Sequence, residues 1–165
     1  MFSAQGIVKP KRLEFEKKTK TERYGKFFAG PFERGYGVTV GNSLRRMLLS
    51  SIEGAAVIGV KFEGIFHEFT SIPGVMEDVT EIILNLKQLD IKLEGAATTK
   101  RLTVKVNKAG KALAKHIDPD PDVIILNPDH HIATVDTDGK LEMEMIIQRG
   151  RGYMPAERHN LSGES

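Results

Sequence analysis

The spacing of apolar side chains changes along the chain, and these changes predict where helices begin and end. Between Thr39 and Ile52 the apolar positions follow one another at spacings of four, three, one and four residues, which places them on one helix face: Val40, Leu44, Met47, Leu48 and Ile52. Thr39 and Asn42 are candidate caps, and Gly54 follows the end. A second helical stripe follows Pro73-Gly74 and consists of Val75, Val79, Ile82, Ile83 and Leu86.

Alternation with a period of two predicts short strands around and after these helices. One run has Ala56, Ile58, Val60 and Phe62 on one face, and Ile65 to Phe69 is predicted as a second strand after a turn at Glu63-Gly64. The later runs are Leu89/Ile91/Leu93, Leu102/Val104/Val106, Val123 to Leu126, His131 to Val135, and Leu141/Met143/Met145/Ile147. Asp138-Gly139 is predicted as a hairpin turn between the last two.

Together these patterns predict an α+β fold of two helices and roughly eight short strands, mostly linked by hairpins. The charged segment Leu13 to Phe28 is expected to add one or two edge strands. Since the period changes near Gly54, we expect two lobes, with a boundary at that glycine.

Composition and charge narrow the class of protein. The chain has 165 residues, 40% hydrophobic and 28% charged, which is typical of a globular protein. Residues 1–26 hold eight Lys/Arg against three Glu, a net charge of +5, and the other 139 residues carry −3 of the total of +2. A basic N-terminal segment of this kind is typically solvated, and contact with nucleic acid is the alternative. The absence of cysteine excludes disulfides and cysteine-based zinc sites.

No apolar run is long enough for a membrane span, and the first residues lack the apolar region of a secretory signal, so we expect no such signal and a cytoplasmic location. No cofactor is expected.

Two glycine and acidic motifs resemble ligand sites but depart from them. Gly35, Gly37 and Gly41 form G-x-G-x-x-x-G, in which the third glycine comes one residue too late for a dinucleotide site. Asp136-Thr137-Asp138-Gly139 resembles the start of a calcium loop, but position 12 is Ile147 in place of the required glutamate. We therefore expect backbone turns at both places.

The remaining polar motifs also favour structural roles. His130 and His131 are expected to point to opposite faces of a strand, which disfavours a zinc site. A single Arg149-Gly150-Arg151-Gly152-Tyr153 segment is too short for an RNA-binding Arg-Gly tract, so we expect it to continue the preceding strand or turn it. We find no acid/base pair or nucleophile arrangement of a recognisable kind.

The arginines of the first helix are more informative. On a helical wheel Arg46 lies opposite the apolar stripe, and Arg45 lies at its border. Arg46 is therefore expected to point away from its own core. It is either an ordinary solvated arginine or an anchor for another chain, because arginine is enriched at binding hot spots.

Four strings in the chain resemble the N-terminal domain of the bacterial RNA polymerase alpha subunit. They are PFERGYGVTVGNSLRRMLLSS (31–51), FHEF (66–69), IPGVMEDVTEIILNLK (72–87) and QRGRGYMPAE (148–157). They follow the family's order and spacing, and the resemblance covers about residues 13–157.

The resemblance implies a scaffold without an active site of its own, within a nucleotidyltransferase. Two alpha subunits form a homodimer, and the pair binds the beta and beta-prime subunits for DNA-templated transcription. Residues 1–53 correspond to the first part of the dimerisation lobe, and residues 54–160 to an inserted lobe that contacts the large subunits. DNA is expected to be reached only through the complete enzyme, and no membrane is expected.

Individual residues take roles from the same resemblance. Arg46 and Lys87 match positions that contact the beta subunit. Another group matches the family signature or lies on the helix stripe, and is assigned to shaping the dimerisation lobe and its interface: Arg34, Gly35, Asn42, Leu44, Arg45 and Leu48. No catalytic residue and no metal ligand is implied.

The chain also departs from the family. Family members continue with the second piece of the dimerisation lobe and a DNA-binding C-terminal domain, whereas this chain ends in the polar residues 161–165. We therefore expect an incomplete dimerisation lobe with a loosened first helix. The alternative to an assembly subunit is a small phosphate- or nucleic-acid-binding protein that uses the glycine and arginine clusters.

Overall fold

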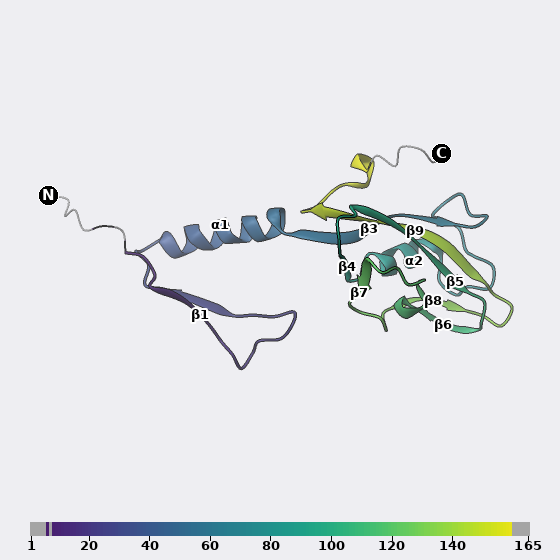
Figure 1. Cartoon of the computed structure of the whole chain (residues 1–165), viewed down its shortest axis with the longest axis horizontal. Helices are drawn as coiled ribbons and strands as arrows, with labels where there is room; N and C mark the ends of the chain where they lie inside the picture. Colours follow the sequence, from purple (N-terminus) through teal and green to yellow (C-terminus); the bar gives the residue numbers. More distant parts are fainter. Residues whose placement is uncertain (1–5, 7, 160–165) are drawn as a thin grey trace. The chain divides into compact units, whose positions relative to one another are not determined.

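The structure, a computed structural model, describes residue 6 and residues 8–159. The chain divides between Ser50 and Ser51 into two compact units. The first unit contains β1 (Arg12–Phe15), β2 (Phe27–Gly30) and all but the last residue of α1 (Tyr36–Ser51) (Figure 1). The second unit contains the other strands and the second helix.

In the first unit, β1 and β2 form an antiparallel hairpin in which Arg12 lies opposite Gly30 and Phe15 opposite Phe27. The predicted edge strands are therefore present. The helix begins earlier than predicted, at Tyr36, because Gly35 turns the chain with a φ of +90°, a value that glycine adopts readily. Thr39 lies within the helix, and its hydroxyl donates to the carbonyl of Gly35 at 3.4 Å. The prediction of Thr39 or Asn42 as the cap is therefore wrong.

The second unit consists of seven strands, one α-helix and two short 3₁₀ helices among the residues that the structure describes. In chain order these are β3 (Glu53–Phe62), α2 (Val79–Leu86), β4 (Ile91–Leu93), β5 (Thr99–Val106), β6 (Gly110–Leu113), η1 (Ala114–His116), β7 (Val123–Ile125), β8 (His131–Val135), β9 (Leu141–Arg151) and η2 (Ala156–Arg158). The predicted α+β class is confirmed.

Five strands form an antiparallel sheet in the order β5-β9-β3-β4-β7, and β6 pairs with β8 in a separate two-stranded sheet. Strands β3 and β9 run side by side in Figure 1 although about half of the chain separates them. The prediction that the strands are mostly linked by hairpins is wrong. Among the strands described, only β1 and β2 form a pair joined by a short connection, and the other pairs bring distant segments together.

A bulge between Val57 and Gly59 changes the predicted alternation of β3. Val57, Val60 and Phe62 lie opposite the buried Ile147, Met145 and Met143 of β9, so these three face the core. Ala56 lies before the bulge and is exposed, so the predicted common face of Ala56, Ile58, Val60 and Phe62 is wrong.

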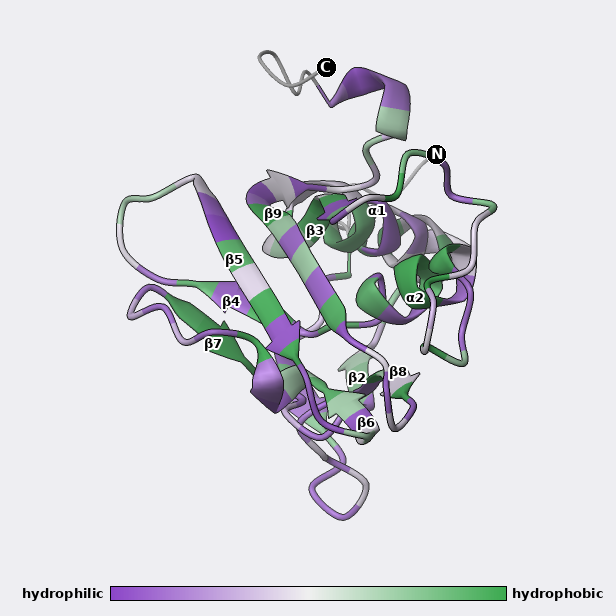
Figure 2. Cartoon of the chain, turned by 90° about the vertical axis from the view of Figure 1, so that its right-hand side faces the viewer, coloured by the Kyte–Doolittle hydropathy of each residue, from purple (hydrophilic) through white to green (hydrophobic). Residues whose placement is uncertain are grey.

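The core of the second unit lies where the sheet, α2 and β8 meet. Its most deeply buried large side chains are Ile82, Leu86, Val104, Ile132, Val135, Leu141, Met145 and Ile147. Figure 2 shows the alternation of apolar and polar residues along β5 and β9 that gives these strands one face toward the core. Asp78 caps α2 by accepting the backbone N–H of Glu81 at 2.7 Å. Val75 of the predicted stripe precedes this helix and bridges to Val135.

One predicted strand is absent, one observed strand was not predicted, and one predicted hairpin turn does not join a hairpin. Residues 65–69 form turns and irregular structure, with Phe66 and Phe69 nearly fully exposed, so the strand predicted there is absent. Strand β6 was missed, because its sequence GKAL lacks a clear alternation. Asp138-Gly139 is a turn, but it does not join a hairpin, because β8 and β9 belong to different sheets.

Candidate protein interface

The exposed face of α1 is the main candidate interface of the first unit. All residues of α1 are described, and none of them is buried. Leu44, Met47 and Leu48 are 57–61% exposed, and Ile52 beyond the helix end is 59% exposed. Val40 is half-buried. The predicted stripe is therefore present and exposed among the residues that the structure describes, and a contiguous apolar helix face of this kind is typical of an association surface.

Polar residues lie on the rest of the helix surface and directly before the helix. Asn42, Arg45 and Arg46 are exposed on α1, and Arg34 and Gly35 lie directly before its first residue. The backbone carbonyl of Arg46 accepts the hydroxyl of Ser50 at 2.7 Å, so the helix is intact at this position. The structure thus brings seven of the eight predicted site residues, Leu44 and Leu48 included, into one unit, on a single helix or directly before it.

Lys87 belongs to the second unit. It is exposed and follows the last residue of α2, where its backbone N–H donates to the carbonyl of Ile83 at 3.0 Å. The neighbouring side chains Leu84 and Glu81 of α2 are also exposed, whereas Val79, Ile82 and Leu86 are buried. Lys87 therefore lies at the outward end of a helix whose other face is anchored in the core.

A carboxylate anchors the chain just before α2, a feature that sequence reasoning missed. Glu77 accepts the backbone N–H of Thr134 at 2.5 Å, the Thr134 hydroxyl at 3.0 Å and His131 Nε2 at 2.8 Å. Burial alone raises the pKa of Glu77, but the hydrogen bonds from Thr134 and His131 together lower the pKa below its ordinary value of 4.5. No local signal could have found this contact, because 57 residues separate Glu77 from Thr134.

Two adjacent histidines, His130 just before β8 and His131 at its start, contact α2 and the residues directly before it. His130 Nε2 lies 3.0 Å from the carbonyl oxygen of Asn85, and the Asn85 side chain donates to the carbonyl of Ile132 at 2.9 Å. His131 Nδ1 is buried without a hydrogen-bond partner in the described part of the chain. Residues 6 and 8–159 contain no cluster of three or more His, Cys, Asp or Glu side chains that could hold a metal ion.

The glycine and arginine motifs have structural roles. Arg149 donates to the carbonyl oxygens of Leu93 and Gly95 at 2.8 and 3.1 Å, and Arg151 pairs with Glu53. Both arginines lie in β9, so the prediction that this segment continues the strand is confirmed. Gly37 and Gly41 lie within α1.

A groove with a volume of ≈ 1170 Å³ lies in the second unit over β3, β5 and β9. It is lined by apolar side chains such as Ile58 and Ile146 and by charged ones such as Lys61 and Glu144. Arg101 also lines the groove and forms an ion pair with Glu144 at 3.2 Å, so part of the charge in the groove is neutralised within the chain.

No helix within the described residues is long and apolar enough to cross a membrane.

Comparison with known proteins gives consistent matches along the chain. Residues 60–165 match the profile of the RNA polymerase Rpb3/RpoA insert domain. Curated relatives include the DNA-directed RNA polymerase subunit alpha of Geobacter metallireducens, which is 53% identical over 155 residues, covering 93% of this chain and 45% of the relative. The corresponding subunits of Desulforudis audaxviator and Leptospira biflexa are 53% and 52% identical, over 93% of this chain and 48% of each relative.

The chain therefore spans about half the length of the curated relatives it matches. The family resemblance inferred from the four sequence strings is confirmed. Since the matched profile covers well over half of its residues, the chain belongs to the RNA polymerase Rpb3/RpoA insert domain family.

Proposed function

We propose that the chain acts as an alpha subunit of bacterial DNA-directed RNA polymerase. In this role it pairs with a second alpha subunit through the exposed face of α1 and carries the beta and beta-prime subunits. Arg46 and Lys87 are proposed as contacts to the beta subunit, and Arg34, Gly35, Asn42 and Arg45 shape the region around the pairing face. This function belongs in the bacterial cytoplasm, and DNA is reached through the complete enzyme.

The observation that carries this proposal is the uncovered apolar stripe of α1 in a chain that is about half identical to alpha subunits. Leu44, Met47 and Leu48 are each more than half exposed. Burying such side chains stabilises an interface by roughly 1.5–3 kcal/mol each. A second copy of the same helix face can supply this burial symmetrically, as in most homodimers.

The proposed subunit contributes no catalytic group. Charged side chains such as Glu77, Arg149 and Arg151 stabilise the fold through hydrogen bonds to distant parts of the chain. In this proposal the polymerisation chemistry belongs to the large subunits, and the alpha subunit acts by bringing them together.

The pairing step can be tested by sedimentation equilibrium of stripe variants. We expect Leu48→Glu to weaken self-association at least about thirtyfold, because about 2 kcal/mol of apolar burial is lost at the interface. Leu49→Glu is the matched control, because Leu49 is equally exposed at 63% but lies outside the stripe on the wheel. A wild-type chain that stays monomeric, or equal effects of the two variants, would contradict pairing through the stripe.

A further inference from the structure

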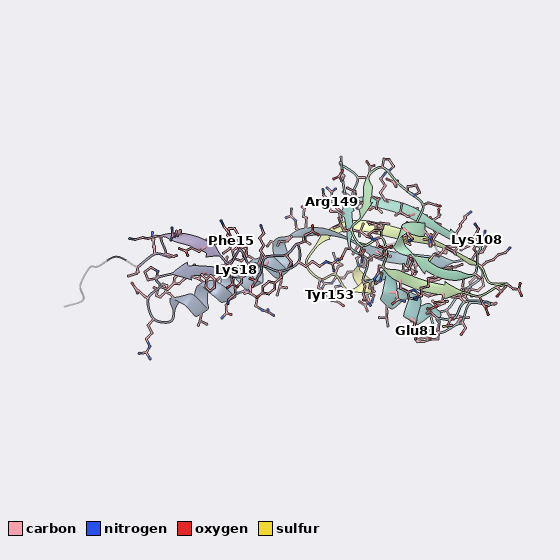
Figure 3. The ribbon with its side chains drawn as sticks, turned by 90° about the horizontal axis from the view of Figure 1, so that it is seen from below. Phe15, Lys18, Glu81, Lys108, Arg149 and Tyr153 are labelled. Atoms are coloured by element: carbon pink, nitrogen blue, oxygen red, sulfur yellow. The ribbon has the colours of Figure 1, made fainter. Side chains whose placement is uncertain are left out.

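The hairpin of β1 and β2 concentrates positive charge outside the surfaces used by the proposed function. The connection between the two strands, residues 16–26, contains five basic residues and two glutamates. Lys17, Lys18 and Lys20 are exposed within four positions of one another. Figure 3 labels Lys18 and Phe15 on this hairpin.

Aromatic rings accompany these cations. Phe15, Tyr24 and Phe27 are 45%, 56% and 59% exposed, so none of them is enclosed in a core. The centroids of Phe15 and Phe27 lie 6.3 Å apart, with the rings tilted at 48°. Lys20 Nζ lies 5.3 Å from the centroid of Phe15, and Lys26 Nζ lies 5.1 Å from that of Phe28. Ring faces and ammonium groups are therefore presented side by side.

The same residues surround a hollow of ≈ 240 Å³. Its lining includes three aromatic residues, three basic residues and two glutamates: Phe15, Tyr24, Phe27, Lys20, Arg23, Lys26, Glu16 and Glu22. At about 30 Å³ per water molecule this hollow is large enough to admit a planar ring beside the aromatic side chains. Exposed ring faces together with an excess of cations, five against two glutamates in residues 16–26, match the two parts of a nucleotide, its base and its phosphate.

We propose that the β1–β2 hairpin binds single-stranded nucleic acid. A base stacks in the hollow against Tyr24, and Lys17, Lys18 and Lys20 contact the phosphates on either side. A single strand fits better than a duplex, because only unpaired bases expose their faces for stacking on side chains. An anionic membrane fits less well, because the rings flank a hollow in place of forming a continuous apolar face.

This site is distinct from the glycine and arginine clusters, whose residues lie in or next to α1 and β9, and from the proposed pairing stripe on α1. The proposal therefore does not depend on the proposed polymerase function.

The test measures fluorescence anisotropy of a labelled oligothymidylate of about 12 nucleotides with the full chain at several salt concentrations. We expect the logarithm of the affinity to fall with the logarithm of salt by about 0.7 per phosphate contacted. The triple variant Lys17→Gln/Lys18→Gln/Lys20→Gln should bind at least about tenfold more weakly, with a salt slope smaller by about 2. Arginine at the same three positions should restore binding.

Two further variants distinguish binding at the hairpin from nonspecific attraction to positive charge. Tyr24→Ala should weaken binding at least about fivefold without changing the salt slope, since it removes a stacking surface only. Lys105→Gln/Lys108→Gln/Lys111→Gln removes the same charge from exposed lysines of the second unit and should leave binding unchanged.

The proposal is overturned if the oligonucleotide does not bind at low salt, or if the two triple variants lose the same affinity. It is also overturned if Tyr24→Ala binds like the wild type, or if vesicles containing phosphatidylserine bind the hairpin while the oligonucleotide does not. Circular dichroism of each variant confirms that the comparison is made between folded chains.

Discussion

At the scale of single residues, the charged groups of this chain divide into those that hold the fold and those that face solvent. Glu77, Arg149 and Arg151 are engaged with partners far away in the sequence. Arg46 and Lys87 are exposed at a helix face and a helix end. This division is expected if the second group serves another protein, because an arginine already committed to its own chain cannot donate to a partner.

We predict that Arg46→Ala weakens capture of the beta subunit while leaving the fold intact. A charged contact that becomes buried in a complex costs about 2–5 kcal/mol when truncated, which is about thirtyfold or more in Kd. Lys87→Ala should have a smaller effect, because lysine lacks the planar donor fork of arginine. The measurement is co-purification or surface binding of the beta subunit, with the melting temperature as the control for folding. If Arg46→Ala mainly unfolds the protein, and the molecules that remain folded bind the beta subunit normally, the proposed contact is refuted.

Glu77 leads to a prediction about stability and pH. Glu77→Ala leaves the buried N–H of Thr134 without its acceptor, so we expect a loss of about 1–3 kcal/mol of unfolding free energy near neutral pH. Because the folded state lowers the pKa of Glu77 below 4.5, its contribution is complete above that value and is lost as the pH falls through the folded pKa.

Urea unfolding from about pH 7 to about pH 3 checks this sign, because the difference between the wild type and Glu77→Ala should shrink on acidification. Glu81→Ala is the control, since Glu81 lies two positions into α2 from Val79 but is exposed. A difference that stays constant or grows on acidification would be inconsistent with the stabilising carboxylate.

At the scale of elements, the two α-helices show what apolar periodicity can predict and what it cannot. Both apolar stripes were predicted from the same periodicity. The buried members of α2, Val79, Ile82 and Leu86, are at most 2% exposed, whereas Leu44 and Leu48 of α1 are more than half exposed. Periodicity identifies the face that needs a partner, but it contains no information on where that partner comes from.

A close approach of two backbone segments gives the element-scale prediction. Gly74 has a φ of +75° and its position leaves no room for a Cβ against the backbone of Gly139, while the carbonyl of Gly74 accepts the N–H of Asp136 at 2.8 Å. Gly74→Ala combines a strained backbone with a steric clash, so we expect a loss of about 2–5 kcal/mol.

Gly64→Ala is a matched control, because Gly64 has nearly the same φ of +73° but open space around it. That variant should lose only the backbone part, about 1–2 kcal/mol. Thermal or urea unfolding measures both. Equal losses would show that the approach of Gly74 to Gly139 does not constrain the fold.

The strands show which parts of the fold were predictable. Strands β4, β5, β7, β8 and β9 were predicted because each carries β-branched or apolar residues on at least one face. Their order in the sheet was not, because pairing between β3 and β9 depends on contacts across about half of the chain. The bulge after Val57 has no local signal, and β6 is too short and too polar to show alternation. The candidate interface was predicted by family resemblance together with the helical wheel, while the Glu77 anchor needed the tertiary structure.

At the scale of the whole molecule, the two units differ in how they are stabilised. In the second unit, a buried cluster formed by the sheet, α2 and β8 encloses the large apolar side chains. In the first unit, α1 has no buried residue and the rings of the hairpin are partly exposed. A unit that lacks buried apolar area opens readily, and its exposed helix face gains stability when a partner covers it.

The central claim is that α1 is an assembly surface, and amide hydrogen exchange tests it most directly. We expect strong protection at 56–62 and 141–147 in the chain alone, and weak protection at 40–52. After addition of a second alpha subunit together with the beta and beta-prime subunits, protection at 40–52 should rise while that of 141–147 stays high. Protection at 40–52 that equals that of β9 without partners, or that does not change on assembly, would contradict the account.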